Sequence, residues 1–171
     1  MKLLREILYK VEINSVIGST SLSINKIEFD SRLISDGDMY IAITGVNVDG
    51  HSFISQAIQN GANCIVCEKT PDNKTDGVVY VNVKSSRKAL AIISSNYFDN
   101  PSSKLNLIGV TGTNGKTTIA TLLFDLYTEL EIKSGLISTV KISYDNKNFQ
   151  ANQTTPDSVS YTHLRAHETV V

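Results

Sequence analysis

The sequence predicts an α/β protein: a small N-terminal α/β domain followed by the start of a second α/β domain that contains a phosphate-binding loop. Three observations support this. Residues 1–100 alternate between short apolar runs and segments with helical spacing. The polar stretch 100–103 contains a proline and is the best domain boundary. Residues 105–125 read as a strand, a glycine-rich turn and a helix. We therefore expect domains at 1–100 and 104–157, and treat 158–171 separately.

The first half supplies the elements expected of the N-terminal domain. Apolar residues at positions 3, 4, 7, 8 and 11 share one face and predict a helix. Gly61 ends a further helix as its C-terminal stop. The expected strands are 26–29, 39–43, 63–68 and 78–83, and the other expected helices are 52–60 and 86–97. This alternation is typical of an α/β layer.

The second half begins with the phosphate-binding unit. Residues 105–110 form a short apolar run that predicts a buried strand, and residues 111–115 are too rich in Gly, Thr and Asn to continue it. From Lys116 the apolar residues fall at helical spacing, and this helix is expected to reach residue 131. A strand at 134–140 and a hairpin formed by 141–144 and 148–151 should follow.

The turn between strand and helix has the chemistry of an anion site. Gly112 and Gly115 let backbone N–H groups turn inward around a phosphate, and the N-terminus of the following helix adds to the attraction. Lys116 can reach the β- and γ-phosphates of a nucleotide, and the Thr117 hydroxyl can ligate Mg²⁺. The strict P-loop pattern would place its first glycine at position 110, where this chain has Val110. The loop therefore departs from the generic pattern. The alternative is a glycine-rich turn that binds nothing.

Composition excludes several other classes of function. The net charge of −1 gives no support for a nucleic-acid or membrane-surface role. No apolar run approaches the length of a membrane span, and the charged N-terminus does not read as a signal peptide. We expect a cytoplasmic monomer that binds neither nucleic acid nor membrane. Cys64 and Cys67 lie in one apolar run and point to opposite faces of a strand, so we interpret them as core thiols.

The loop sequence TGTNGKTT at 111–118 resembles the ATP loop of the Mur ligases, the ATP-dependent enzymes that add amino acids to the peptidoglycan precursor. The motifs DSR at 30–32, GDMYIA at 37–42 and DGHSF at 49–53 resemble the N-terminal domain of two of these ligases. One adds the third residue of the stem peptide (the MurE type) and the other the terminal dipeptide (the MurF type). Asn114 and the stretch TTPD at 154–157 are similar to the MurE type.

This resemblance implies an activity and a set of site residues. The reaction is ATP-dependent phosphorylation of a carboxylate in UDP-N-acetylmuramoyl-L-alanyl-D-glutamate, followed by attack of the amine of meso-diaminopimelate or L-lysine. Lys116 is the expected catalytic residue, and Thr117 the expected Mg²⁺ ligand. The implied ATP-binding residues are Gly112, Thr113, Asn114, Gly115, Lys116, Thr117 and Thr118. The implied substrate-binding residues are Phe29, Ser31, Val46, Asn47, Val48, Gln153, Thr154 and Thr155.

Simpler interpretations stand beside some of these assignments. Asp30 and Arg32 can form a structural ion pair that closes a turn, which is the interpretation we favour. Asp49 followed by Gly50 reads as turn chemistry rather than as a ligand contact. Thr154 and Thr155 can be an ordinary pair at a strand end.

The end of the chain carries two further expectations. Residues 158–171 resemble translated sequencing-adaptor sequence, and the i, i+4 pair His163 and His167 lacks the further ligands of a zinc site. The family's second Mg²⁺ ligand, its modified lysine and its C-terminal domain fall beyond residue 171. We therefore expect an inactive fragment of a MurE-type ligase. The alternatives are a MurF-type ligase that adds D-alanyl-D-alanine and a non-catalytic nucleotide-binding module.

Overall fold

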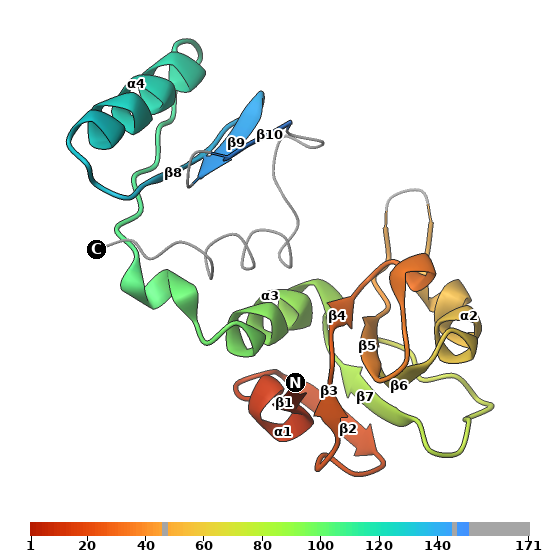
Figure 1. Cartoon of the computed structure of the whole chain (residues 1–171). Helices are drawn as coiled ribbons and strands as arrows, with labels where there is room; N and C mark the ends of the chain where they lie inside the picture. Colours follow the sequence, from red (N-terminus) through yellow and green to blue (C-terminus); the bar gives the residue numbers. More distant parts are fainter. Residues whose placement is uncertain (46–47, 145–146, 151–171) are drawn as a thin grey trace. The chain divides into compact units, whose positions relative to one another are not determined.

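The computed structural model describes residues 1–45, 48–144 and 147–150 (Figure 1). By contacts within the chain it divides into two compact units, Met1–Tyr97 and Phe98–Val171. The first unit contains parallel strands joined by helical segments, and this confirms the predicted α/β class.

A five-stranded sheet forms the centre of the first unit. Its strands follow the order β2 (Ile13–Ile17), β7 (Val79–Val83), β6 (Ala62–Cys67), β5 (Asp38–Ile41) and β4 (Ile27–Glu28). The pairs β4–β5, β5–β6 and β6–β7 are parallel, and β2 pairs with β7 in the antiparallel direction. Every residue of β5 is buried, which is typical of a parallel strand covered on both faces.

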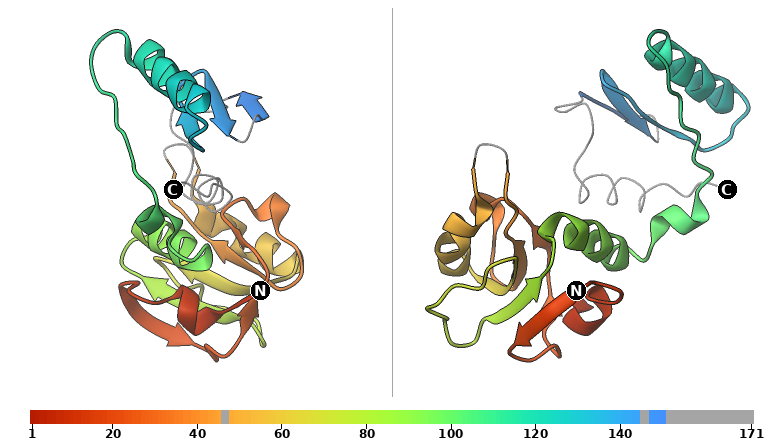
Figure 2. Two further views of the ribbon diagram at one scale, coloured as in Figure 1. Left: turned by 60° about the vertical axis from the view of Figure 1, so that its left-hand side comes forward. Right: turned by 180° about the vertical axis from the view of Figure 1, so that it is seen from behind.

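Each face of the sheet packs against helices (Figures 1 and 2). Helix α2 (Ile54–Gln59) covers one face, where Ile54 and Ala57 pack with Tyr40, Ile65 and Tyr80. Helix α3 (Ser86–Tyr97), at the bounds that the sequence predicts, lies on the other face with α1 (Leu4–Ile7) beside it.

The two cysteines confirm the prediction of core thiols. Both are free and fully buried in β6, and Cys67 belongs to the cluster under α2. Cys64 is three residues away and therefore points to the opposite face. Burial raises the pKa of each thiol, so neither is suited to redox or metal chemistry.

The first 24 residues differ from the prediction. Instead of a helix over 3–11, strand β1 (Lys2–Leu3) pairs with β3 (Ser23–Ile24) and the four-residue helix α1 follows. Leu4 and Ile7 are buried as expected, but Leu3 is extended and Lys10 adopts a left-handed conformation with φ of 62°. Strand β2 was not predicted, because most of its side chains are exposed and show no period-two apolar pattern.

The helix expected at 52–60 forms in two parts. A 3₁₀ turn, η2 (Gly50–Phe53), precedes α2, just as η1 (Ser31–Leu33) follows β4. Gly61 ends α2 as predicted, with φ of 108° and its N–H donating to the Ile58 carbonyl at 3.0 Å. A Cβ at this position would lie 2.7 Å from Asp36 Cα, so only glycine fits.

The second unit contains a 3₁₀ turn, η3 (Pro101–Lys104), a long helix and a small sheet. Helix α4 spans Lys116–Glu129, two residues short of the predicted end. Strands β8 (Gly135–Ile137), β9 (Lys141–Tyr144) and β10 (Lys147–Gln150) form an antiparallel sheet in the order β10-β9-β8. The predicted hairpin is therefore confirmed.

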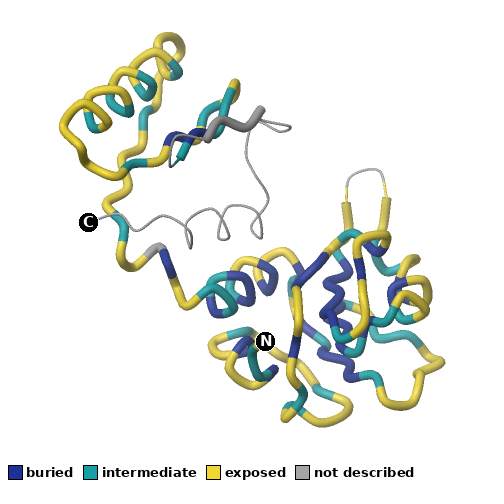
Figure 3. Tube along the Cα trace, viewed as in Figure 1, coloured by how far each residue is buried: buried dark blue, intermediate teal, exposed yellow. Residues whose placement is uncertain are grey.

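The strand predicted at 105–110 is wrong. These residues adopt no regular secondary structure, and Leu107 and Ile108 are exposed. A strand requires a hydrogen-bonded neighbour, and none of the strands that the structure describes pairs with this segment. None of the residues of helix α4 is buried; they are exposed or half-buried (Figure 3).

Asn96 ties α3 to the end of α1 and to the residues that follow it, and it provides a test of this packing. Its buried amide donates to the carbonyls of Ile7 at 2.9 Å and Tyr9 at 2.6 Å. We expect Asn96→Ala to lower the free energy of unfolding by about 1–3 kcal/mol, because the carbonyl of the buried Ile7 loses its partner. Urea unfolding followed by circular dichroism measures the change. The control is Asn14→Ala, which removes an exposed amide hydrogen bond to Asn82 and should have a smaller effect.

Candidate functional site

The carboxyl ends of the parallel strands meet at one edge of the first sheet. Ligands of open α/β sheets bind at this edge. Phe29 and Ser31 follow β4, Thr44 lies three residues beyond β5, and Glu68 follows β6 directly. Two of the substrate-binding residues expected from the sequence, Phe29 and Ser31, therefore lie at the edge where a ligand is expected.

The turn after β4 is closed by an ion pair. Asp30 accepts hydrogen bonds from the backbone N–H of Arg32 at 3.0 Å and from its guanidinium Nη2 at 2.7 Å. The Arg32 guanidinium is the main reason that the pKa of Asp30 lies below its ordinary value. This confirms the structural interpretation of the pair, which caps η1.

Ser31 and Phe29 differ in how available they are to a ligand. Ser31 is only 5% exposed, its hydroxyl donates to Gln56 Oε1 at 3.0 Å, and its carbonyl accepts from Asn60 Nδ2 at 2.8 Å. Because the hydroxyl hydrogen is donated to Gln56, a ligand would have to donate a hydrogen bond to the hydroxyl oxygen of Ser31. Phe29 is 38% exposed and presents apolar surface.

A short hairpin extends from the end of β5. Thr44 and Asp49 form an antiparallel bridge, and the Gly45 N–H donates to the Val48 carbonyl at 2.9 Å. Val48 is exposed. Val46 and Asn47, and Gln153, Thr154 and Thr155, lie outside the described residues. The roles of all these residues stay predictions.

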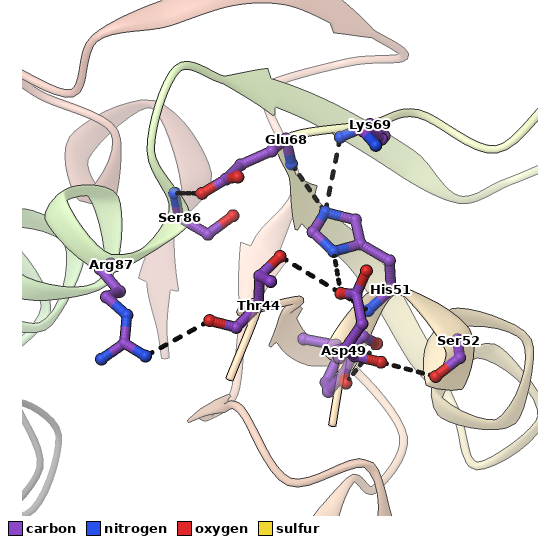
Figure 4. A network of polar contacts seen from close by, with 10 residues as sticks. Thr44, Asp49, His51, Ser52, Glu68, Lys69, Ser86 and Arg87 are labelled. Atoms are coloured by element: carbon purple, nitrogen blue, oxygen red, sulfur yellow. Dashed lines mark hydrogen bonds and ion pairs between the residues drawn. The ribbon is translucent and has the colours of Figure 1, made fainter. Parts of the chain in front are cut away.

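A polar network that the sequence analysis missed supports this hairpin (Figure 4). The side chain of Asp49 accepts from the His51 N–H at 3.0 Å and lies 2.7 Å from His51 Nδ1. His51 Nε2 accepts from the Glu68 N–H at 3.0 Å, which makes Nδ1 the donor in the neutral ring. Glu68 Oε1 in turn accepts from the Ser86 N–H at 2.8 Å.

Only part of this network had a signal in the sequence. Asp49 caps η2, and this confirms its interpretation as turn chemistry. Hydrogen bonds from His51 hold the pKa of Asp49 below its ordinary value. His51 lies in the motif DGHSF, so a role for it could have been predicted. Its partner Glu68 is 17 residues away, and no local pattern links the two residues.

In the second unit, the predicted phosphate loop precedes α4. Gly112 and Gly115 have φ of 150° and 77°, and an added Cβ would have nothing closer than 3.6 Å at either. The two glycines are therefore required by backbone conformation rather than by space. Lys116 begins the helix, and its ammonium donates to the carbonyls of Gly112 at 2.6 Å and Thr113 at 3.2 Å.

The remaining loop residues can be reached from solvent. Thr113, Asn114 and Thr118 are exposed, and Thr117 is half-buried in the first turn of α4. Gly115 caps the helix without a side-chain hydrogen bond, so its own cap position leaves the first N–H groups of α4 open to an anion. Among the described residues, no group of three His, Cys, Asp or Glu side chains could hold a metal ion. The helices that the structure describes include none suited to cross a membrane.

The fold and the two sites define the class of protein. Residues 23–98 match the family model for the Mur ligase family, catalytic domain, and residues 110–169 match the model for the Mur ligase middle domain. The chain belongs to the Mur ligase family, whose members are ATP-dependent ligases.

Two curated relatives carry the name UDP-N-acetylmuramoyl-L-alanyl-D-glutamate–2,6-diaminopimelate ligase. The protein from Cytophaga hutchinsonii is 48% identical over 95% of this chain and 34% of its own length. The protein from Clostridium tetani is 42% identical over 91% of this chain and 33% of its own length. The chain therefore spans about a third of the relatives that it matches.

Two solved structures show the same fold. A UDP-N-acetylmuramoyl-L-alanyl-D-glutamate–2,6-diaminopimelate ligase aligns with a TM-score of 0.72 over 96% of this chain and 33% of its own, at 20% identity. MurF ligase from Thermotoga maritima, solved in complex with ADP, aligns with a TM-score of 0.51 over 64% of this chain and 24% of its own, at 30% identity.

The middle-domain match bears on the segment 158–171. The match extends to residue 169 and so includes most of this segment. It gives no support to an adaptor origin, which stays a prediction because residues 151–171 lie outside the described part of the chain.

The carboxylates that cap η1 and η2 predict a loss of stability in acid. The pKa of Asp49 is lowered by hydrogen bonds from His51, so its contribution is present above the ordinary pKa of 3.8 and lost as pH falls through the lower folded value. We expect Asp49→Asn to lower the melting temperature of the first unit at neutral pH, with the difference disappearing by about pH 2. Circular dichroism melts across this range measure it. Asp72→Asn, in the loop before β7, controls for the loss of one charge.

Proposed function

We propose that this chain is the front part of a ligase that uses ATP to add 2,6-diaminopimelate to UDP-N-acetylmuramoyl-L-alanyl-D-glutamate in peptidoglycan synthesis. The main support is the agreement of the two relatives described above, 48% and 42% identical to this chain, which both carry this activity in their names. The names of these relatives favour this activity over the MurF-type alternative.

The phosphate loop supplies the ATP side of this proposal. The N–H groups at the start of α4 and the Lys116 ammonium together present positive charge to a triphosphate. For Lys116 to reach the phosphates, its hydrogen bonds to the Gly112 and Thr113 carbonyls are exchanged for bonds to phosphate oxygens. Thr113, Asn114 and Thr118 complete the loop. Mg²⁺ held by the Thr117 hydroxyl would screen the charge of the triphosphate.

The carboxyl edge of the first sheet supplies the uridine-nucleotide side. Phe29 offers an exposed ring surface on which a base can pack, and Val48 offers apolar surface on the hairpin. Ser31 contributes a hydroxyl that is already oriented by Gln56. We also propose that the protein acts as a cytoplasmic monomer, apart from membranes.

The 171-residue chain should bind substrate without turning it over. Calorimetric titration with UDP-N-acetylmuramoyl-L-alanyl-D-glutamate is expected to show weak binding, because the residues proposed for the uridine nucleotide belong to the first unit. A parallel assay should detect no substrate-dependent release of phosphate from ATP. The 171 residues match about a third of the length of the relatives, and a misplacement of the reacting groups by about 1 Å can already cost about 100-fold in rate. Robust phosphate release would contradict the expected inactivity. Absence of binding by a folded sample would contradict the substrate assignment.

Lys116 separates the ATP side from the nucleotide-sugar side. In a full-length ligase that carries this sequence, Lys116→Ala should abolish turnover and leave binding of the uridine nucleotide nearly unchanged, because Lys116 serves only the triphosphate. Lys133→Ala, which removes an equal charge from an exposed position after α4, is the matched control. Equal loss in both variants would show that the effect is not specific to the loop.

A further inference from the structure

The hairpin after β5 carries part of the proposed substrate site but lies outside the five-stranded sheet. The Thr44–Asp49 bridge and the hydrogen bond from Gly45 to Val48 close it internally. Its base continues to Gly50, whose N–H donates to the Ile43 carbonyl at 2.9 Å. Two-stranded hairpins are marginally stable alone, so external contacts determine how firmly this one is held.

The first external contact comes from α3. Arg87 Nη2 donates to the Thr44 carbonyl at 3.3 Å, across 43 residues of sequence (Figure 4). The Arg87 side chain is exposed and takes no part in the core. Its contact with Thr44 is therefore separable from the packing of the domain.

The second contact fixes the opposite side of the hairpin. Thr44 Oγ1 donates to Asp49 Oδ1 at 3.3 Å, and the same carboxylate accepts from the His51 ring. The ring is anchored in turn by the N–H of Glu68 at the end of β6. Because the Glu68 carboxylate accepts from the Ser86 N–H, both contacts lead back to the first turn of α3.

We propose that Arg87 and His51 are positioning residues for the uridine-nucleotide substrate. They hold Thr44 and Asp49 at the base of the hairpin, so that Val48 is already placed when the nucleotide arrives. Neither residue contacts the ligand in this proposal. A loop held in its bound conformation saves the entropy of ordering on binding, and this raises affinity without adding a contact. The proposal rests on the function proposed above.

Amide hydrogen exchange of the unliganded chain tests the anchoring itself. Arg87→Met retains the aliphatic stem and removes the guanidinium donor. We expect exchange at the Gly45 and Gly50 amides to accelerate about threefold to tenfold, the effect of losing one hydrogen bond. Lys88→Met is the matched control, since it removes an equal charge from the next exposed position of α3. Unchanged exchange in Arg87→Met overturns the proposal.

Ligand titration tests whether the anchoring serves the substrate. In Arg87→Met the dissociation constants for UDP-N-acetylmuramoyl-L-alanyl-D-glutamate and for uridine should rise by the same factor, about threefold to tenfold. Lys88→Met should leave both unchanged. A rise for the nucleotide but not for uridine would mean that Arg87 binds phosphate directly, and it would overturn the positioning role.

His51 provides a second and independent variant. His51→Ala should raise both dissociation constants, and His51→Gln, which keeps an amide donor and an acceptor, should lie between it and the wild type. Circular dichroism melts identify folded samples. Because the two residues hold one hairpin, the effects of Arg87→Met and His51→Ala should combine to less than their product. A double variant that reaches the full product overturns the shared anchor.

The two proposals fail in different ways. A wild-type chain that binds neither probe contradicts the proposed function and the positioning role together, while the exchange experiment still reports whether Arg87 anchors the hairpin. Wild-type binding with equal affinity in Arg87→Met contradicts the positioning role alone.

Discussion

The parallel pairing of β5 with β6 is the constraint on which the first unit depends. Tyr40 pairs with Ile65 and Ile41 with Val66, and all four side chains are buried. Since these strands are covered on both faces, their register cannot shift without moving apolar groups into water. The same register brings the ends of β5 and β6 to one edge, where His51 can join the hairpin to Glu68. The polar network therefore depends on the packing of the core.

Local patterns in the sequence were sufficient for much of this fold. Helix α3 has its predicted bounds, and β5, β6 and β7 lie within one residue of theirs at the N-terminal side, because each is an uninterrupted apolar or amphipathic run. The glycine loop before α4 was equally predictable from the sequence, because glycine is the residue best suited to the positive φ angles found at Gly112 and Gly115.

The failures have a common physical cause, which is dependence on distant partners. Residues 105–110 have the composition of a strand but no described strand pairs with them. Strand β2 has little apolar pattern and forms because β7 offers a free edge. The candidate site shows the same division. Asp30 and Asp49 act on residues two positions away and were interpreted correctly, whereas Glu68 and Arg87 act across 17 and 43 residues.

The buried thiols have a practical consequence. Cys64 and Cys67 are the only cysteines of the chain, and both belong to the first unit. With burial raising the pKa of both and excluding solvent, they react with a maleimide or a disulfide reagent only after β6 has opened. Thiol labelling thus reports the opening of the first unit alone, without an engineered probe, even in a longer chain if its further segments contain no cysteine.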